Sequence, residues 1–524
     1  MKNLSQINNK REAVTAAPAA ERTIERPIVR EERVFSTSLT LAVIAVILVF
    51  NVVFYILASF FGLYFSPTKS KPQTLTGTTD AVFAETIAKK RTVKIYFCND
   101  EEALKAHDTG ALVYETAKLY EERYPDFIDI EYINIITKRD SKGNRFPLSN
   151  YTKNDEIIYK TSVIFECVES GEYKVVTDAY TGAGYADFYT LDSQGYILSY
   201  DGEEFFASMI SWVLAQEHKK AYFTTTHSEQ VDATFAKLLM AAGYESNMVN
   251  LRESAVPDDA DILVISNPQS DFEIAVDGSG IAVATSEIGR LDAYLKRGGN
   301  IYVSLDPYVK KLYTLESFLE GYGIGLSESE IDGKIYRDIV RDNANAITTN
   351  GYTIVTDHAD GALATEIAEN MDKYSKNDVI IREAGALTLT GTAEALLTSS
   401  RSAVCENGGV VTKTGGTFPV AAYNTVPASD GEQGTIFVVS SIYMTVSDAL
   451  VTNGYSNKDF MYSLFDYLYG AENMPYGCQS VLYDSSVLEN LTMSTANIYT
   501  AIVLAVPAII AVFGAVVVIR RKNR

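Results

Sequence analysis

Two long apolar segments, one near each end, constrain what this chain can fold into more than any other feature. Residues 39–65 and 498–519 contain no Asp, Glu, Lys or Arg, and each exceeds the roughly 20 residues that a helix needs to cross a bilayer. Their outer flanks are basic: residues 1–38 hold 7 basic and 5 acidic side chains, and residues 520–524 hold four basic ones. The positive-inside rule therefore predicts two membrane helices, both termini in the cytoplasm and a large domain on the outer face of the plasma membrane.

A cleaved signal peptide is the alternative interpretation of the first apolar segment. Apolar cores of signal peptides run to about 15 residues and end at a small-residue cleavage site. Residues 39–65 are longer and end in an aromatic run without an A-x-A pattern. We therefore expect an uncleaved anchor.

The region between the apolar segments is strongly acidic. Without the two terminal tails it holds 34 basic and 62 acidic residues, a balance of −28. This charge keeps an exposed domain soluble and argues against nucleic acid as a partner. The spacing of cysteine and histidine matches no metal or redox motif, so we expect no metal and no cofactor. The pairing of the four cysteines stays open: Cys98, Cys167, Cys405 and Cys478.

The first external domain is expected to begin with a strand–helix–strand unit. Residues 92–97 and 127–135 alternate like strands, and residues 110–123 have helical spacing. Residues 163–167 and 173–177 then resemble a hairpin around Ser170-Gly171.

A second α/β domain follows, with strands expected at 220–224, 261–266, 300–305 and 434–440. Helices between them predict an open, mostly parallel sheet covered on both faces. Thr226-His227-Ser228-Glu229 fits a capping box, which predicts a helix start there. The full division is: tail 1–38, membrane helix 39–65, first external domain 74–215, second domain 216–326 and 434–475 with a β-rich insertion at 327–433, linker 476–497, membrane helix 498–519 and basic tail 520–524.

The order of several short motifs resembles the GldG-like family of auxiliary components of ABC-type transport systems. The motifs are an acidic turn at 201–203, a G-H-G-E turn replaced here by residues 226–229, a D-x-L-V-I-x-x-P run at 261–268, a Y-L-x-x-G-G run at 294–299, a D-P turn at 306–307 and an N-x-D-F helix start at 457–460. Both glycines of the G-H-G-E turn are absent. The resemblance implies a multi-span permease and a cytoplasmic ATPase as partners.

Catalysis is not expected. The α/β domain resembles the class I glutamine-amidotransferase architecture, whose nucleophile lies on a sharp strand-to-helix turn. The matching turn here is Asp306-Pro307-Tyr308, which holds neither Cys nor Ser, and the chain has no P-loop.

Two candidate sites remain, and both have ordinary structural explanations. His227, Glu229 and Asp306 follow strand ends, where α/β sheets bind ligands; a capped helix start and an Asp–Pro turn would explain them equally. A Tyr-rich stretch is a candidate contact loop, or simply packed strands: Tyr180, Tyr185, Tyr189, Tyr196 and Tyr200. The function we expect is that of a membrane-anchored, non-catalytic auxiliary subunit. A stand-alone envelope receptor and an amidotransferase-like hydrolase are the alternatives.

Overall fold

The computed structural model describes most of the region between the apolar segments. The described residues are 75–152, 157–177, 185–192, 194–215, 217–276, 278–279, 283–374, 378–428, 432–452, 454–469, 474–478, 480–482 and 520. The expected membrane segments, the tails and most of the linker lie outside them. Within the described residues, no helix has the length and apolar character needed to cross a membrane.

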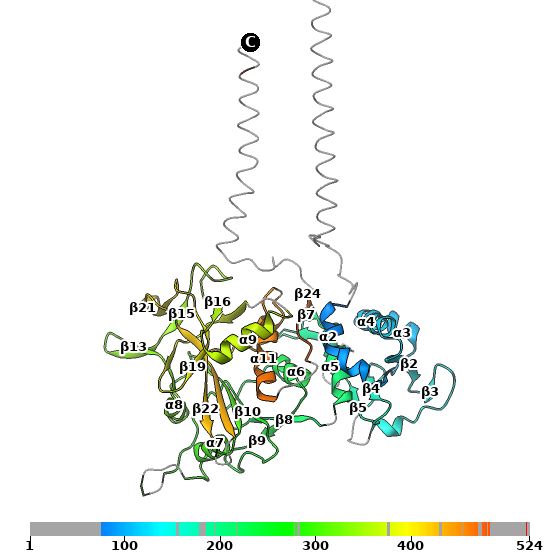
Figure 1. The fold of residues 1–524 in the computed structure, drawn as a ribbon, viewed down its shortest axis with the longest axis horizontal. Helices are drawn as coiled ribbons and strands as arrows, with labels where there is room; N and C mark the ends of the chain where they lie inside the picture. The colour runs from blue at the N-terminus through cyan, green and yellow to red at the C-terminus, as the bar shows by residue number, and fades with distance from the viewer. Residues whose placement is uncertain are drawn as a thin grey trace, which may run out of the picture. The chain divides into compact units, whose positions relative to one another are not determined.

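The first domain is built on a five-stranded sheet in the order β3-β2-β1-β4-β5 (Figure 1). β1 and β2 are parallel, and α4 (Gly110–Arg123) connects them, so the strand–helix–strand prediction is confirmed. The hairpin of β4 and β5 is also confirmed. Helix α4 buries Val113, Ala117 and Tyr120 against the sheet, because residues at these spacings share one helix face. The other elements of this domain are α2 (Gly77–Ala88), β1 (Val93–Phe97), α3 (Glu101–Lys105), β2 (Ile128–Asn134), β3 (Arg139–Asp140), η1 (Leu148–Tyr151), β4 (Val163–Cys167), β5 (Tyr173–Val176), η2 (Ala186–Phe188), β6 (Tyr189–Leu191), β7 (Ile197–Tyr200) and α5 (Gly202–Leu214).

A nine-stranded sheet forms the second domain, in the order β17-β16-β19-β22-β23-β11-β10-β8-β9. The strands from β9 to β23 are parallel, and β23 rejoins the sheet beside β11 late in the chain, as predicted. The pairings from β23 to β17 are antiparallel. The sheet is therefore mixed and not mostly parallel, because a short loop joins β22 to β23 and only antiparallel strands can be joined that way. Its strands are β8 (Lys219–Thr224), β9 (Tyr244–Val249), β10 (Ile262–Ser266), β11 (Asn300–Ser304), β16 (Thr353–His358), β17 (Val379–Arg382), β19 (Glu394–Thr398), β22 (Pro419–Pro427) and β23 (Gln433–Val439).

Helices cover both faces of this sheet. Ile262 and Val264 of β10 belong to one core, which includes side chains of α6, α9 and α11, while Leu263 and Ile265 belong to another, with side chains of α7 and α8. Alternate residues of a strand point to opposite faces, so a continuously apolar strand requires two covered faces. The helices are α6 (Ala233–Ala241), α7 (Glu287–Lys296), α8 (Tyr313–Gly321), α9 (Ala362–Met371), α10 (Ser447–Leu450) and α11 (Asn457–Tyr469).

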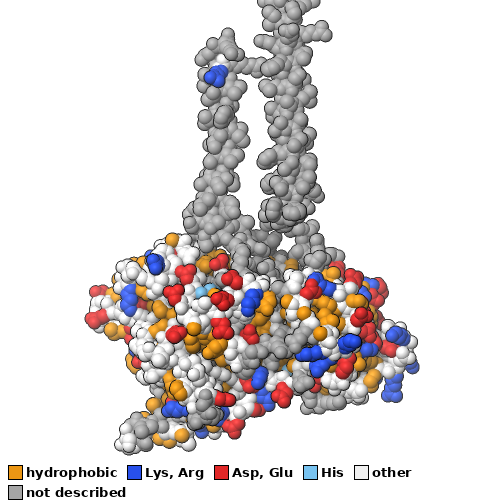
Figure 2. Space-filling view, viewed as in Figure 1, with side chains coloured by type: hydrophobic (Ala, Val, Ile, Leu, Met, Phe, Trp, Pro, Cys, Tyr) orange, Lys and Arg blue, Asp and Glu red, His pale blue; other side chains and the backbone are white. Residues whose placement is uncertain are grey.

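The β-rich segment at 327–433 contributes four strands to this large sheet, and its other strands form small sheets beside it. These small sheets pair β13 (Glu328–Ile331) with β14 (Lys334–Arg337), β15 (Ile339–Arg341) with β20 (Val404–Asn407) and β21 (Val410–Thr414), and β18 (Leu387–Leu389) with β12 (Ile324–Leu326), which lies just before the segment. On the face shown in Figure 2, acidic and basic side chains are interspersed with apolar ones.

The expected capping box does not start a helix. Helix α6 begins at Ala233, and its cap is Asp232, whose carboxylate accepts a hydrogen bond from Thr234 N. Thr226 and Ser228 have positive φ angles of 90° and 55°, which no helix start accommodates. The Glu229 carboxylate accepts from the backbone N–H of His227, so it closes a tight turn instead.

Candidate functional site

The parallel half of the large sheet contains the reversal of strand order at which other α/β proteins form a ligand-binding crevice. Its strands run in the order β9-β8-β10-β11-β23, so the direction of the connections reverses between β8 and β10. Ligands of such sheets bind beyond the carboxyl ends of the strands at that reversal. His227 and Glu229 follow β8 at this position, as the sequence analysis expected.

The structure fills this crevice with the protein's own side chains. His227 is fully buried, which corrects the expectation of an exposed histidine. Its Nδ1 lies 3.2 Å from Glu229 Oε1, and its Nε2 lies 3.2 Å from Glu287 Oε2. The imidazole stacks on Phe272 with ring centroids 3.8 Å apart. Both ring nitrogens are therefore occupied.

Hydrogen bonds between the loop that follows β8 and the loop that follows β10 also close this crevice. The backbone N–H groups of Gln269 and Ser270 both donate to the carbonyl of His227. Asn267 Nδ2 donates to Gln230 Oε1 at 3.0 Å, and Gln269 Nε2 donates to Asn267 Oδ1 at 2.8 Å. A ligand could enter only by breaking this network.

The charges around His227 favour its protonated form. Burial by itself lowers the pKa of His227, but the hydrogen bond that the imidazole donates to Glu229 and the charge of Glu287 outweigh it, so the pKa is raised above its usual value. Burial likewise acts to raise the pKa of Glu229, yet the hydrogen bonds from His227 and from backbone N–H groups bring it below its usual value. A histidinium held between two carboxylates is a structural ion cluster in this environment.

Asp306 does not join this cluster. Its Oδ1 accepts a hydrogen bond from Tyr308 N at 2.8 Å, as in an ordinary Asp–Pro turn. Within the described part of the chain, no hydrogen bond or ion pair connects it to His227 or Glu229. Among the residues that the structure describes, no group of three His, Cys, Asp or Glu side chains is arranged to hold a metal ion.

The candidate contact loop is mostly core. Tyr185, Tyr189 and Tyr200 are buried, and Tyr189 Oη donates to the carbonyl of Thr109. Packing therefore explains these three, and the contact-loop prediction is wrong for them. Tyr196 is 69% exposed, and Tyr180 lies outside the described residues.

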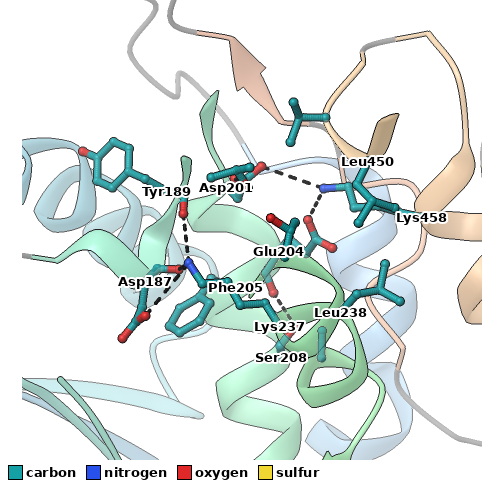
Figure 3. Close-up of a pocket in the computed structure, with 14 residues that line it drawn as sticks. Asp187, Tyr189, Asp201, Glu204, Phe205, Ser208, Lys237, Leu238, Leu450 and Lys458 are labelled. Atoms are coloured by element: carbon teal, nitrogen blue, oxygen red, sulfur yellow. Dashed lines mark hydrogen bonds and ion pairs between the residues drawn. The ribbon is translucent and has the colours of Figure 1, made fainter. Parts of the chain in front are cut away.

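A buried polar joint connects the two domains, and sequence reasoning did not single it out. Lys458 of α11 forms an ion pair with Glu204 of α5, and Lys458 Nζ lies 3.8 Å from Asp201 Oδ1 (Figure 3). Tyr462 Oη donates to the other oxygen of Glu204 at 2.6 Å. The neighbouring pocket of about 50 Å³ has room for a few water molecules.

The pKa directions at this joint reflect its burial. Burial raises the pKa of Glu204, and the charge of Lys458 offsets this only in part. Burial also acts to lower the pKa of Lys458, but Glu204 and Asp201 outweigh it and raise the value. The lysine therefore stays charged.

Two of the short motifs from the sequence analysis, the acidic turn at 201–203 and the N-x-D-F helix start at 457–460, lie together at this joint. Asp201 and Glu204 belong to or adjoin the acidic turn, and Lys458 lies within the N-x-D-F stretch. Asn457 in the same stretch donates to and accepts from the backbone of Ile380 in β17. Neither stretch of sequence revealed that the two would meet.

Residues near both ends of the described range 75–482 lie beside this joint. Thr76 donates to Glu203 Oε1 through its backbone N–H at 2.6 Å and its hydroxyl at 2.7 Å. At the other end, β24 (Val481–Leu482) pairs antiparallel with β7, just before the acidic turn. Thr76 and β24 therefore both lie beside the acidic turn.

Comparisons with known proteins leave the family open. No family model matches the chain, and no curated protein matches it. Solved structures similar to part of it include the N-terminal domain of mmIFT52, with 15% identity and a TM-score of 0.34 over 48% of this chain and 97% of that one. A putative ThuA-like protein from Bacteroides uniformis has 10% identity and a TM-score of 0.30 over 50% and 97%. PurLQS from Thermotoga maritima has 10% identity and a TM-score of 0.27 over 48% and 100%. TM-scores this low leave the function to be argued from the residues themselves.

Proposed function

We propose that this chain is a membrane-anchored, non-catalytic auxiliary subunit of an ABC-type transport system, similar to the GldG-like proteins. In this proposal residues 39–65 and 498–519 are membrane helices that dock on a multi-span permease served by a cytoplasmic ATPase. The external domain contacts cargo, envelope or other subunits. The observation that carries the proposal is the convergence of residues 76 and 481–482 on the turn at 199–204, because it lets two anchors leave one domain side by side.

Backbone geometry at the G-H-G-E position supports the resemblance. Thr226 and Ser228 stand where the family has glycines, and both have positive φ angles. Glycine adopts such angles without strain, whereas Thr and Ser do so at a cost. This chain therefore has, at Thr226 and Ser228, the backbone angles that glycine would favour at these two positions.

The closed crevice supports a non-catalytic role. An amidotransferase-like layout, which is the finer form of the fold proposal, needs a nucleophile after β11, and Asp306-Pro307-Tyr308 offers none. A stand-alone receptor that used the His227 crevice would need an open site, but His227 and its two carboxylates are buried. Both alternatives are weaker for these reasons.

Copurification tests the partnership. The tagged full-length chain would be crosslinked in cells, extracted in mild detergent and analysed by mass spectrometry. We expect a multi-span permease and an ATPase at near-stoichiometric levels. A matched control keeps residues 75–482 and replaces both apolar segments with unrelated membrane helices, which should remove these partners. Recovery of the chain alone would contradict the proposal.

Surface labelling tests the topology. The four native cysteines are buried, so they should react slowly with a maleimide that does not cross membranes. Tyr196→Cys places a thiol at an exposed position of the external domain. We expect this variant to label on intact cells, and labelling only after lysis would contradict an outer-face domain.

A further inference from the structure

A second, open groove lies beyond the carboxyl end of β11, apart from the His227 cluster and the Lys458 joint. It has a volume of about 500 Å³, within the range of ordinary ligand pockets. The turn after β11, the start of α8 and the β13–β14 hairpin form its walls. This hairpin projects from the edge of the domain in Figure 1.

Tyrosines rim this groove. Tyr308 is 59% exposed, Tyr313 is 69% exposed and Tyr336 is 37% exposed, with Ile335 beside them. Tyrosine contributes a large apolar ring and a hydrogen-bonding hydroxyl, and it loses little entropy on binding. A cluster of such side chains around a hollow marks a contact surface.

The floor of the groove holds a donor without an internal partner. Arg337 is only 9% exposed, and its Nη2 donates to Glu316 Oε1 at 2.6 Å. Its Nη1 is buried and makes no hydrogen bond with any described residue. An unsatisfied buried donor is costly, so a ligand carbonyl that displaces the cover of Nη1 and reaches it would be bound favourably.

Charge in the groove disfavours an anionic ligand. Glu316 neutralises Arg337, and Glu328 neutralises Lys311 at 2.9 Å. Burial first, and then the charges of Glu383 and other carboxylates nearby, raise the pKa of Tyr308 to about 12, so its hydroxyl remains a donor. The groove therefore offers the donors of Arg337 and the tyrosines without a net charge to attract an anion.

We propose that this groove binds a proline-rich, extended segment of a partner polypeptide. Such segments form polyproline II helices, which dock in aromatic-lined grooves. Proline has a carbonyl acceptor and no N–H, which complements the donors of Arg337 and the tyrosines. A neutral oligosaccharide is the competing ligand, because sugar hydroxyls can also bond the tyrosine hydroxyls, and the test below distinguishes the two.

The test uses the full-length chain alone in a lipid nanodisc, so its outcome does not depend on the transport role. Fluorescein-labelled decaproline would be titrated and followed by fluorescence anisotropy. We expect saturable binding, and none of a Gly/Ser peptide of the same length. Tyr308→Ala and Tyr336→Ala should each weaken binding by about tenfold, because each removes a ring from the contact.

Two further variants separate groove binding from general effects. Arg337→Lys keeps the positive charge beside Glu316 but removes the second nitrogen, and we expect binding to weaken by several-fold. Tyr196→Ala removes a tyrosine as exposed as Tyr313 but outside the groove, and it should bind like the unmodified chain. Absence of decaproline binding, binding unaffected by Tyr308→Ala, or displacement of the peptide by maltoheptaose would each overturn the proposal.

Discussion

Lys458 and Glu204 lie 254 residues apart in the sequence, yet they form an ion pair at the junction of the two domains. Both side chains are nearly buried, and Tyr462 donates to the second carboxylate oxygen. The pair connects the start of α5 with the first turn of α11, beside the residues that contact Thr76 and β24.

Removal of Lys458 should therefore destabilise the protein. Lys458→Met leaves Glu204 buried without its cation, which costs about 3–5 kcal/mol. The fluorescence of Trp212, the single tryptophan and a buried residue of α5, reports unfolding by denaturant in detergent. In a double-mutant cycle with Glu204→Gln, the combined loss should be smaller than the sum of the single losses. Additive losses would show that the pair does not couple the domains.

Gly202→Ala should disrupt the acidic turn. A Cβ atom at Gly202 would lie 2.0 Å from Tyr200 Oη, and this hydroxyl is held by Thr116 and Leu112, so the ring cannot move away. We expect a loss of several kcal/mol, as for other overpacked sites.

Gly321→Ala is the matched control for this substitution. Gly321 is also helical, but a Cβ atom there meets nothing within 4 Å. Helix propensity predicts a gain of up to about 1 kcal/mol. Equal effects of the two substitutions would contradict the proposed contact with Tyr200.

The His227 cluster should make stability dependent on pH. Its pKa is raised from 6.5, so its contribution is complete below about pH 6.5 and is lost as the pH rises through the higher folded-state value. The unmodified chain should therefore lose more stability than His227→Gln between pH 6 and pH 8.5, measured by thermal unfolding. The pKa of His218 is instead lowered by burial, so its contribution rises with pH and His218→Gln should change the slope in the opposite sense. Identical slopes for all three proteins would contradict this assignment.

Ser228→Gly should stabilise the turn. The φ angle of Ser228 is 55°, a conformation that costs a non-glycine residue on the order of 1 kcal/mol or more. Glycine removes this strain but adds entropy to the unfolded chain, so a net gain of up to about 1 kcal/mol is expected. The midpoint of denaturant unfolding would measure it, and a clear loss of stability would show that the hydroxyl has another role.

Local pattern predicted most of the elements, because hydrophobic periodicity and turn residues act over a few positions. The first strand–helix–strand unit, the hairpin at 163–176 and the continuously apolar strand β10 were all expected correctly. The start of α6 was not, because the turn at 226–229 is stabilised by the backbone N–H groups of Gln269 and Ser270, which belong to a different loop.

The candidate sites were harder to predict, because exposure is a property of the whole fold. Nothing local to His227 reveals that Phe272 and Glu287 cover it, and nothing local to Tyr200 reveals that α4 does. The Arg337 groove had no signal in the sequence, since its walls come from separate segments that only the fold brings together.

The sequence by itself determined the acidic region between two apolar segments, the alternation of strands and helices, and the order of the motifs. These features depend on composition and on short-range spacing. The tertiary structure decided that the pairings from β23 through β22, β19 and β16 to β17 are antiparallel. It also decided that the crevice at His227 is closed and that Lys458 meets Glu204. These outcomes depend on contacts between residues far apart in the chain, whose energies no local pattern contains.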